Sequence, residues 1–166
     1  MLERAETSGE GDVDMRILIA AVGRARSGGA HDLYETYTGG LPWPTTLREI
    51  AAAKARSAKE RIRREGEALV KTIPSGSVRV ALDESGQNLS SNAFAKRIAS
   101  WRDSGRPDLA FVLGGADGLA EEIIRSADLV LALGTMTWPH LLARAMVMEQ
   151  LYRASAILSG HPYHRE

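Results

Sequence analysis

Several polar side chains with useful chemistry lie together at the carboxyl end of the chain, in the sequence HPYHRE over 161–166. An imidazole titrates near neutral pH, and an arginine can contact phosphate through two hydrogen bonds. Such a tail is suited to orienting a nucleic acid or moving a proton, whereas a solvated, frayed chain end is the alternative. The candidate functional residues, with no general base singled out among them, are His161, Tyr163, His164 and Arg165.

Two glycine-containing segments each follow a short apolar run. The first is GGADG at 114–118, and the second is GTMTWPH at 134–140. In open α/β sheets, ligands bind beyond the carboxyl ends of the strands, where glycine lets a ligand approach the backbone. Backbone groups beside a large aromatic such as Trp138 suit a flat, largely neutral ring, such as that of adenosine, better than a triphosphate. A tight turn after a strand is the alternative for either glycine cluster taken alone.

Conventional catalytic and metal motifs are missing from the sequence. GGADG matches neither a dinucleotide-binding nor a Walker motif, and Asp117 within it would repel phosphate. The chain has no cysteine, which excludes disulfides, thiolate catalysis and cysteine-ligated zinc. Its four histidines show no HExxH or HxxxH spacing, and no serine lies in a GxSxG turn. We therefore expect neither a bound metal nor a hydrolase triad.

Length and charge place the chain among ordinary globular proteins. Its 166 residues suit one domain, and 44% apolar with 25% charged residues is close to the globular average. The 21 basic and 21 acidic side chains cancel, so any contact with a nucleic acid must rest on local patches. No apolar run reaches the ~20 residues that cross a bilayer, and the N-terminus lacks the order of a signal peptide. A cytoplasmic protein is the expectation.

Short apolar runs alternate with helical patterns along the chain. Strands are predicted at 16–22, 78–82, 109–113 and 129–133, with a weaker candidate at 154–158, and helices at 46–71, 88–104, 119–126 and 139–152. This alternation predicts an α/β fold, with a mostly parallel sheet flanked by helices on both faces. The expected organisation is a disordered extension over residues 1–14 and a single domain over residues 15–166.

Two segments between the first and second predicted strands need a separate interpretation. Residues 28–46 are rich in Gly, Pro, Thr and aromatics and predict a loop with some helix of its own. The predicted helix at 46–71 is locally basic, and it offers four pairs of opposite charge at i,i+4 spacing. A solvated, salt-bridged face and an RNA-facing patch both fit it. The pairs are Arg56 with Glu60, Glu60 with Arg64, Arg61 with Glu65, and Arg63 with Glu67.

The order of four segments resembles one bacterial enzyme family. MRILIAAVG, LGGADG, LALGTMTWPHLLARAMVMEQLYRA and HPYHRE occur in the order found in the 23S ribosomal RNA pseudouridine N3-methyltransferases of the SPOUT class. The resemblance runs from Met15 to Glu166. GGADG stands where a proline followed by glutamate is frequent in that family, and Trp138 stands in place of a Leu or Phe. Both departures keep the glycines and the bulky apolar position.

The resemblance implies a C-terminal trefoil knot whose loops bind S-adenosylmethionine in a bent form. It also implies a homodimer, in which each protomer completes the cofactor pocket of the other, and methylation at N3 of a pseudouridine in the assembled ribosome. Tyr152 and Arg153 are substrate-binding candidates, with packing and surface solvation as the alternative. The family's cofactor-binding positions map onto Leu82, Gly114, Gly115, Gly134, Thr135, Met136, Thr137, Trp138 and Pro139.

Two other functions stay open at this stage. One is a catalytically inactive, ribosome-associated RNA-binding protein of the same fold. The other is a nucleotide phosphate-binding α/β protein, which the missing lysine in GGADG disfavours.

Overall fold

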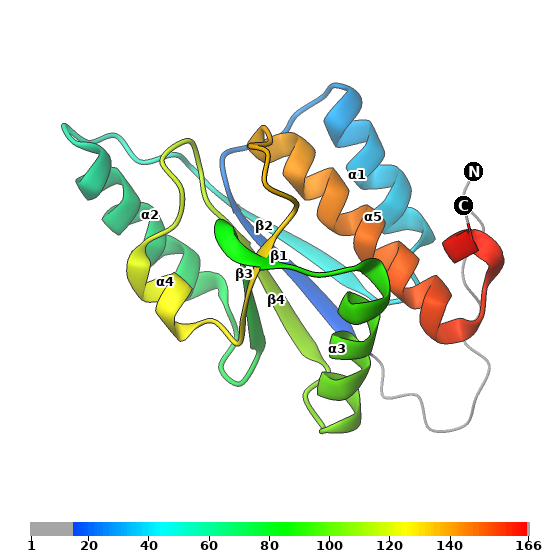
Figure 1. Cartoon of the computed structure of the whole chain (residues 1–166). Coiled ribbons are helices and arrows are strands. Elements are labelled where there is room, and N and C mark those ends of the chain that lie inside the picture. Colours follow the sequence, from blue (N-terminus) through cyan, green and yellow to red (C-terminus); the bar gives the residue numbers. More distant parts are fainter. Residues whose placement is uncertain (1–14, 166) are drawn as a thin grey trace.

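The computed structural model describes residues 15–165, in which five strands form one parallel sheet of order β2-β1-β4-β3-β5 (Figure 1). The predicted extension over residues 1–14 lies outside the described residues. The α/β class with a parallel sheet is confirmed. The elements are β1 (Arg16–Val22), α1 (Gly29–Gly40), β2 (Thr45–Ile50), α2 (Ala58–Thr72), β3 (Val78–Asn88), α3 (Ser91–Asp103), β4 (Asp108–Leu113), α4 (Glu121–Ser126), β5 (Leu129–Ala132), α5 (His140–Ser159) and the short 3-10 helix η1 (Pro162–Arg165).

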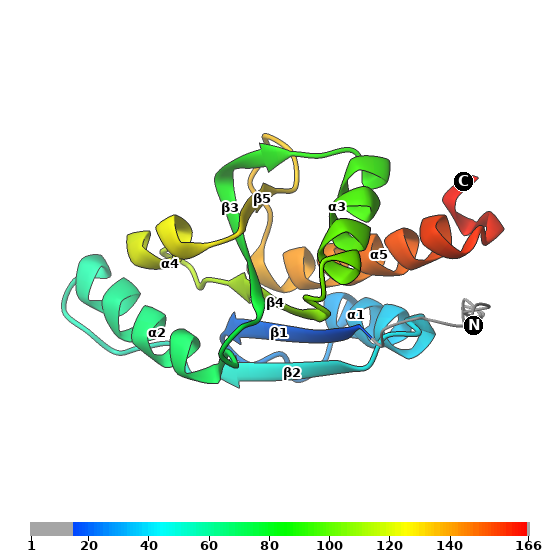
Figure 2. The same ribbon diagram turned by 90° about the horizontal axis from the view of Figure 1, so that it is seen from below.

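Helices cover both faces of the sheet, with α1, α3 and α5 on one side and α2 and α4 on the other (Figures 1 and 2). Successive side chains of a strand point to opposite faces, so the apolar runs supply both layers of core. In β1, Ile19 and Ala21 join the cluster under α1, α3 and α5, whereas Ala20 and Val22 join the cluster under α2 and α4. Burial on both faces explains why the central strands are continuous apolar runs.

Side-chain caps mark the beginnings of two helices. The Ser57 hydroxyl accepts a hydrogen bond from the Glu60 amide at 3.2 Å, and the Ser90 hydroxyl accepts one from the Ala93 amide at 3.1 Å. Each cap satisfies an amide that has no partner within its helix. α5 ends at Gly160, whose φ of 75° lies in the left-handed region that glycine adopts readily.

The predicted helix at 46–71 is wrong over its first twelve residues, 46–57. Thr45–Ile50 is β2, an edge strand that pairs in parallel with β1 in the register Ile17 to Thr45. Its side chains are half-exposed, so it lacks the continuous apolar run that identifies a buried strand. The helix begins after a seven-residue connection, at Ala58. The opposite charges at i,i+4 spacing explain why the whole segment resembled one long helix.

The segment at 28–46, predicted as a loop with some helix of its own, contains the twelve-residue helix α1, which the sequence did not locate. Glycines at both ends and two threonines hide its helical period, because these residues have low intrinsic helix propensity. Packing overrides that propensity: Tyr34 is buried in the core, and the Tyr37 ring centroid lies 6.1 Å from that of Tyr152 on α5.

The weaker strand candidate at Ala154–Leu158 is also wrong, because these residues form the last turns of α5. α5 lies against both α1 and α3, so its apolar residues extend around much of the helix. A five-residue apolar run has the same appearance in a buried helix and in a buried strand.

β3 is longer than predicted and includes the polar residues DESGQN. Its pairing with β5 shifts register between Leu82 and Gln87, and the strand passes close to β5 at Gly86. A Cβ at Gly86 would stand 2.7 Å from the carbonyl carbon and oxygen of Val130. A residue with a side chain therefore does not fit at this crossing.

Candidate cofactor pocket

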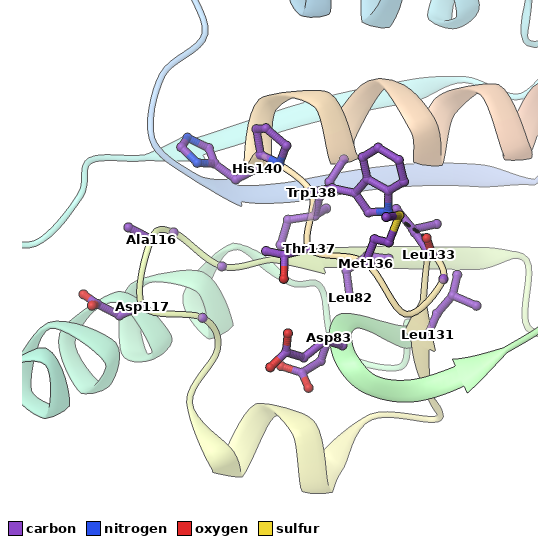
Figure 3. Close-up of a pocket in the computed structure, with 18 residues that line it drawn as sticks. Leu82, Asp83, Ala116, Asp117, Leu131, Leu133, Met136, Thr137, Trp138 and His140 are labelled. Atoms are coloured by element: carbon purple, nitrogen blue, oxygen red, sulfur yellow. Dashed lines mark hydrogen bonds between the residues drawn. The ribbon is translucent and has the colours of Figure 1, made fainter.

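A pocket of about 500 Å³ opens at the carboxyl ends of β3, β4 and β5 (Figure 3). The middle of β3, the two glycine loops that follow β4 and β5, and the start of α5 line it. The lining residues include eight of the nine predicted cofactor positions, and Thr135 is not among them. Those eight are Leu82, Gly114, Gly115, Gly134, Met136, Thr137, Trp138 and Pro139.

The first glycine loop, residues 114–118, closes on itself. The Gly118 amide donates to the Gly115 carbonyl at 3.1 Å, and Gly118 has a φ of 85°. A Cβ at Gly114 would stand 2.6 Å from the Gly118 carbonyl carbon, and one at Gly115 would stand 3.0 Å from Cγ1 of Val22. The turn therefore requires small residues, and it leaves backbone groups at the pocket wall.

The second glycine loop is held by two hydrogen bonds. The indole N–H of Trp138 donates to the Leu133 carbonyl at 2.8 Å, and the Gly134 amide donates to Oδ1 of Asn88 at 3.1 Å. Trp138 remains 39% exposed and Met136 74% exposed, although both line the pocket. Large apolar side chains left uncovered at a pocket are suited to packing against a ligand ring.

Carboxylates give the pocket a negative wall. Asp83, Glu84 and Asp117 all line it. Asp117 accepts a hydrogen bond from the Arg61 guanidinium at 2.8 Å, and this bond lowers the pKa of Asp117, so the carboxylate is ionised at neutral pH. A negative wall disfavours a triphosphate and favours a ligand that carries positive charge. The nucleotide phosphate-binding alternative therefore loses support.

Two of the four predicted i,i+4 pairs form in α2, and the other two do not. Glu60 with Arg64 and Arg63 with Glu67 form ion pairs at 2.5 and 2.7 Å. Arg61 turns instead to Asp117 on the pocket loop, and Glu65 accepts a hydrogen bond from the Ala53 amide at 2.9 Å. Helix spacing alone predicts neighbours on one helix, so it missed these contacts to other segments.

An ion pair between α5 and β2 was not predicted from the sequence. Arg144 of α5 is 2% exposed and donates to Oε2 of Glu49 at 2.7 Å and to the carbonyls of Val22 and Gly23 at 2.9 and 2.7 Å. Glu49 also accepts from the Ala25 amide at 2.7 Å. Burial raises the pKa of Glu49, but the hydrogen bonds from Ala25 and Arg144 outweigh it, and the pKa is lowered. The partners are 95 residues apart, so no local pattern indicates them.

The C-terminal tail packs onto the carboxyl half of α5. The Tyr163 hydroxyl donates to Oε1 of Glu149 at 3.2 Å and lies 3.4 Å from the Tyr37 hydroxyl. The Tyr163 ring stands edge-on to Tyr152 with centroids 4.7 Å apart, and the Arg153 guanidinium lies 4.8 Å from its centroid. Burial, followed by the contacts with Tyr37 and Glu149, raises the pKa of Tyr163 above its ordinary value. The tail is thus anchored to its own helix through Tyr163.

The structure does not bring the predicted catalytic and cofactor residues together within one chain. The pocket is lined by His140 and Ala143 at the start of α5, whereas the tail follows the end of this 20-residue helix. The tail folds back along the helix, and Tyr163 contacts Glu149, which lies roughly 14 Å from His140 at ~1.5 Å per residue. Tyr152 is 1% exposed and takes part in the core. None of the six tail and α5 candidates lines the pocket: His161, Tyr163, His164, Arg165, Tyr152 and Arg153.

Two further features concern the described residues 15–165. Within them, no three His, Asp or Glu side chains are arranged to hold a metal ion. No helix in this range has the length and apolar character needed to span a bilayer.

A parallel sheet with a ligand pocket at its carboxyl edge, walled by glycine loops without a phosphate motif, defines a cofactor-binding α/β protein. A family model described as a predicted SPOUT methyltransferase matches residues 15–164, and the chain belongs to this family. S-adenosylmethionine is the cofactor of the family. The resemblance seen in the sequence is confirmed.

Two curated relatives are similar in sequence to this chain over most of its length. The ribosomal RNA large subunit methyltransferase H of Rhodospirillum centenum is 58% identical over 151 residues, which is 91% of this chain and 99% of that protein. The protein of the same name from Paramagnetospirillum magneticum is 48% identical over 151 residues, which is again 91% of this chain and 99% of that protein. A solved structure of a probable methylase family protein from Haemophilus influenzae matches the fold with a TM-score of 0.55 at 14% identity, covering 89% of this chain and 69% of that chain.

Proposed function

We propose that the chain is an S-adenosylmethionine-dependent methyltransferase that acts in the cytoplasm on N3 of a pseudouridine in 23S ribosomal RNA, with the assembled ribosome as its substrate. The names of the curated relatives support the RNA class of the substrate. The observation that carries the proposal is the pocket at the carboxyl edge, where both glycine loops and Leu82 meet.

The pocket residues fit the cofactor in shape and charge. Gly114, Gly115 and Gly134 leave backbone groups accessible, and Trp138 with Met136 supplies apolar surface for the adenine ring. Thr135, Thr137, Pro139 and Leu82 would complete the contacts. The bound cofactor supplies an electrophilic methyl group on a positively charged sulfonium, and the acidic side chains Asp83, Glu84 and Asp117 that line the pocket suit that charge.

A homodimer is part of the proposal, because no residue of the tail lines the pocket of its own chain. Two chains arranged around a twofold axis can place each tail at the pocket of the other. His161 and His164 would then present their imidazoles to the base, and Arg165 would contact phosphate. Tyr163 would act as a neutral hydrogen-bonding group, because its pKa is raised. Together these groups would orient the pseudouridine and assist loss of the N3 proton.

The trefoil knot belongs to the same proposal. One close chain crossing near the pocket supports it, where β3 passes β5 at Gly86. This crossing leaves room for glycine alone, as expected where segments are threaded tightly past one another.

Calorimetry and mass spectrometry test the proposal. The purified protein should bind S-adenosylmethionine, and 23S ribosomal RNA from cells that lack the gene should lack one methyl group on a pseudouridine. Whole ribosomes should be methylated far better than a short isolated hairpin, because a chain of zero net charge has little general affinity for RNA. Cofactor binding without any change in the RNA would indicate the inactive RNA-binding alternative.

A further inference from the structure

Ion pairs with carboxylates hold nine of the sixteen arginines between residues 15 and 165, and several of the cations outside these pairs gather on two neighbouring loops. Ion pairs hold Arg16, Arg61, Arg63, Arg64, Arg102, Arg106, Arg125, Arg144 and Arg153. Four exposed cations on two loops, Arg24, Arg26, Lys54 and Arg56, have no ion pair with any residue between 15 and 165. We call these four residues the basic edge. Their charge remains available to a partner.

The two loops that carry the basic edge are anchored through the residues between the cations. In the β1–α1 loop, the Ala25 amide donates to Glu49 at 2.7 Å. In the β2–α2 loop, the Ala55 carbonyl accepts from Arg61 at 3.3 Å. Ala25 and Ala55 are half-buried, whereas the residues on either side of each are exposed. The anchors therefore fix the backbone while the flanking cations project into solvent.

Further anchors tie the second loop to α2. The Ala53 amide donates to Glu65 at 2.9 Å, and the Lys54 carbonyl accepts from Arg64 at 3.0 Å. A loop fixed at three consecutive residues loses little further conformational entropy when its side chains bind a ligand.

The basic edge continues the rim of the cofactor pocket. Its loops follow neighbouring parallel strands, joined at their ends by a 2.8 Å hydrogen bond from the Gly23 amide to the Ile50 carbonyl. The pocket loop lies against β1 and α2, the elements next to these loops, since a Cβ at Gly115 would stand 3.0 Å from Cγ1 of Val22 and 3.4 Å from Oε2 of Glu65. In Figure 1 the connections β1–α1 and β2–α2 lie at the same edge of the sheet as the yellow-green loop before α4.

We propose that Arg24, Arg26, Lys54 and Arg56 bind the phosphate backbone of the ribosomal RNA beside the cofactor pocket. This inference rests on the proposed function and names the residues that hold its substrate. The pocket wall of Asp83, Glu84 and Asp117 repels phosphate, so the RNA backbone must run outside it while a base enters. The basic edge is adjacent, unpaired and positively charged, and guanidinium groups match phosphate geometry. A chain of zero net charge needs such a local patch to hold RNA.

Charge removal tests the basic edge. Two double variants, Arg24→Gln with Arg26→Gln and Lys54→Gln with Arg56→Gln, should each raise KM for unmodified ribosomes about tenfold while leaving kcat unchanged. The dependence of log KM on log salt should become shallower by roughly 1 for each phosphate that the variant no longer binds. S-adenosylmethionine affinity, measured by calorimetry, should stay at the wild-type value and also shows that each variant is folded.

The matched control removes two charges at the opposite edge of the sheet. Lys71→Gln with Arg125→Gln, at the ends of α2 and α4, should leave KM and its salt dependence unchanged. Basic-edge variants that match this control would overturn the inference, even with the proposed function intact. The variants could instead bind ribosomes more weakly but bind protein-free 23S ribosomal RNA as well as the wild type does. This result would show that the basic edge contacts an acidic protein surface of the ribosome, and it would overturn the RNA assignment. A wild-type protein that fails to methylate ribosomes would refute the proposed function itself.

Discussion

Arg144 and Glu49 form a buried ion pair with an Nη1–Oε2 distance of 2.7 Å, and this pair joins α5 to β2 beneath the pocket. The same guanidinium holds the carbonyls of Val22 and Gly23 at the end of β1. One side chain therefore fixes two neighbouring strand ends against the helix that begins at the pocket. Glu49 also accepts a hydrogen bond from the Ala25 amide, so the ion pair fixes the β1–α1 loop as well.

Removal of Arg144 should be strongly destabilising. Arg144→Met keeps much of the apolar stem but leaves the Glu49 carboxylate and two carbonyls without their donor, which should cost roughly 3–5 kcal/mol of unfolding free energy. Urea denaturation followed by circular dichroism measures this decrease. Arg125→Met is the matched control, because the exposed pair of Arg125 with Glu121 contributes under about 1 kcal/mol. Similar decreases in both variants would contradict a special role for the buried pair.

Glu49 should make stability depend on acid pH. Its folded-state pKa lies below the ordinary value of 4.5, so ionised Glu49 contributes stability that is fully present above pH 4.5 and is lost as pH falls through the folded pKa. Glu49→Gln should therefore be less stable than the wild type at pH 6, and this difference should narrow below pH 4.5. Denaturation at several pH values measures both. A difference that stays constant down to the lowest accessible pH would argue against ionised Glu49.

The sequence predicts the sheet well where burial on both faces makes a strand a continuous apolar run, as in β1 and β4. It fails for β2, whose half-exposed residues share the charge pattern of the helix that follows. It fails for the end of α5, where a buried helix is apolar on many sides. The glycine loops can be found because glycine marks close backbone approach, whereas Arg144 with Glu49 and Arg61 with Asp117 depend on tertiary contacts over many residues.

Gly114 should be essential for cofactor binding. Gly114→Ala places a methyl group about 2.6 Å from the Gly118 carbonyl carbon, so the pocket loop must open. Affinity for S-adenosylmethionine, measured by calorimetry, should fall at least tenfold, which corresponds to about 1.4 kcal/mol. Gly39→Ala in α1 is the control, because a Cβ there meets no atom within 4 Å. Unchanged affinity in Gly114→Ala would show that the cofactor does not depend on this loop.

Tyr163 should act without changing its protonation state. Its raised pKa keeps the phenol neutral at physiological pH, so Tyr163→Phe should lower methylation several-fold and leave the shape of the pH–rate profile unchanged. His161→Asn and His164→Asn are the comparison variants, and loss of a histidine that serves as base should remove the acid limb of the profile. An inflection that disappears in Tyr163→Phe would indicate instead that the phenol titrates during catalysis.

The separation of tail and pocket along α5 predicts that two different inactive variants will restore activity together. A protein lacking residues 161–166 keeps its pocket, and Gly114→Ala keeps its tail. If the tail acts on the pocket of the other protomer, random exchange makes about half of the dimers mixed, each with one complete site, and recovers about one quarter of wild-type activity. Methylation of ribosomes by the mixture, compared with each variant alone, measures the recovery. A double variant with both changes on one chain, mixed with wild type, controls for exchange. A mixture of the two single variants that stays inactive while this control exchanges would place the tail's function within its own chain.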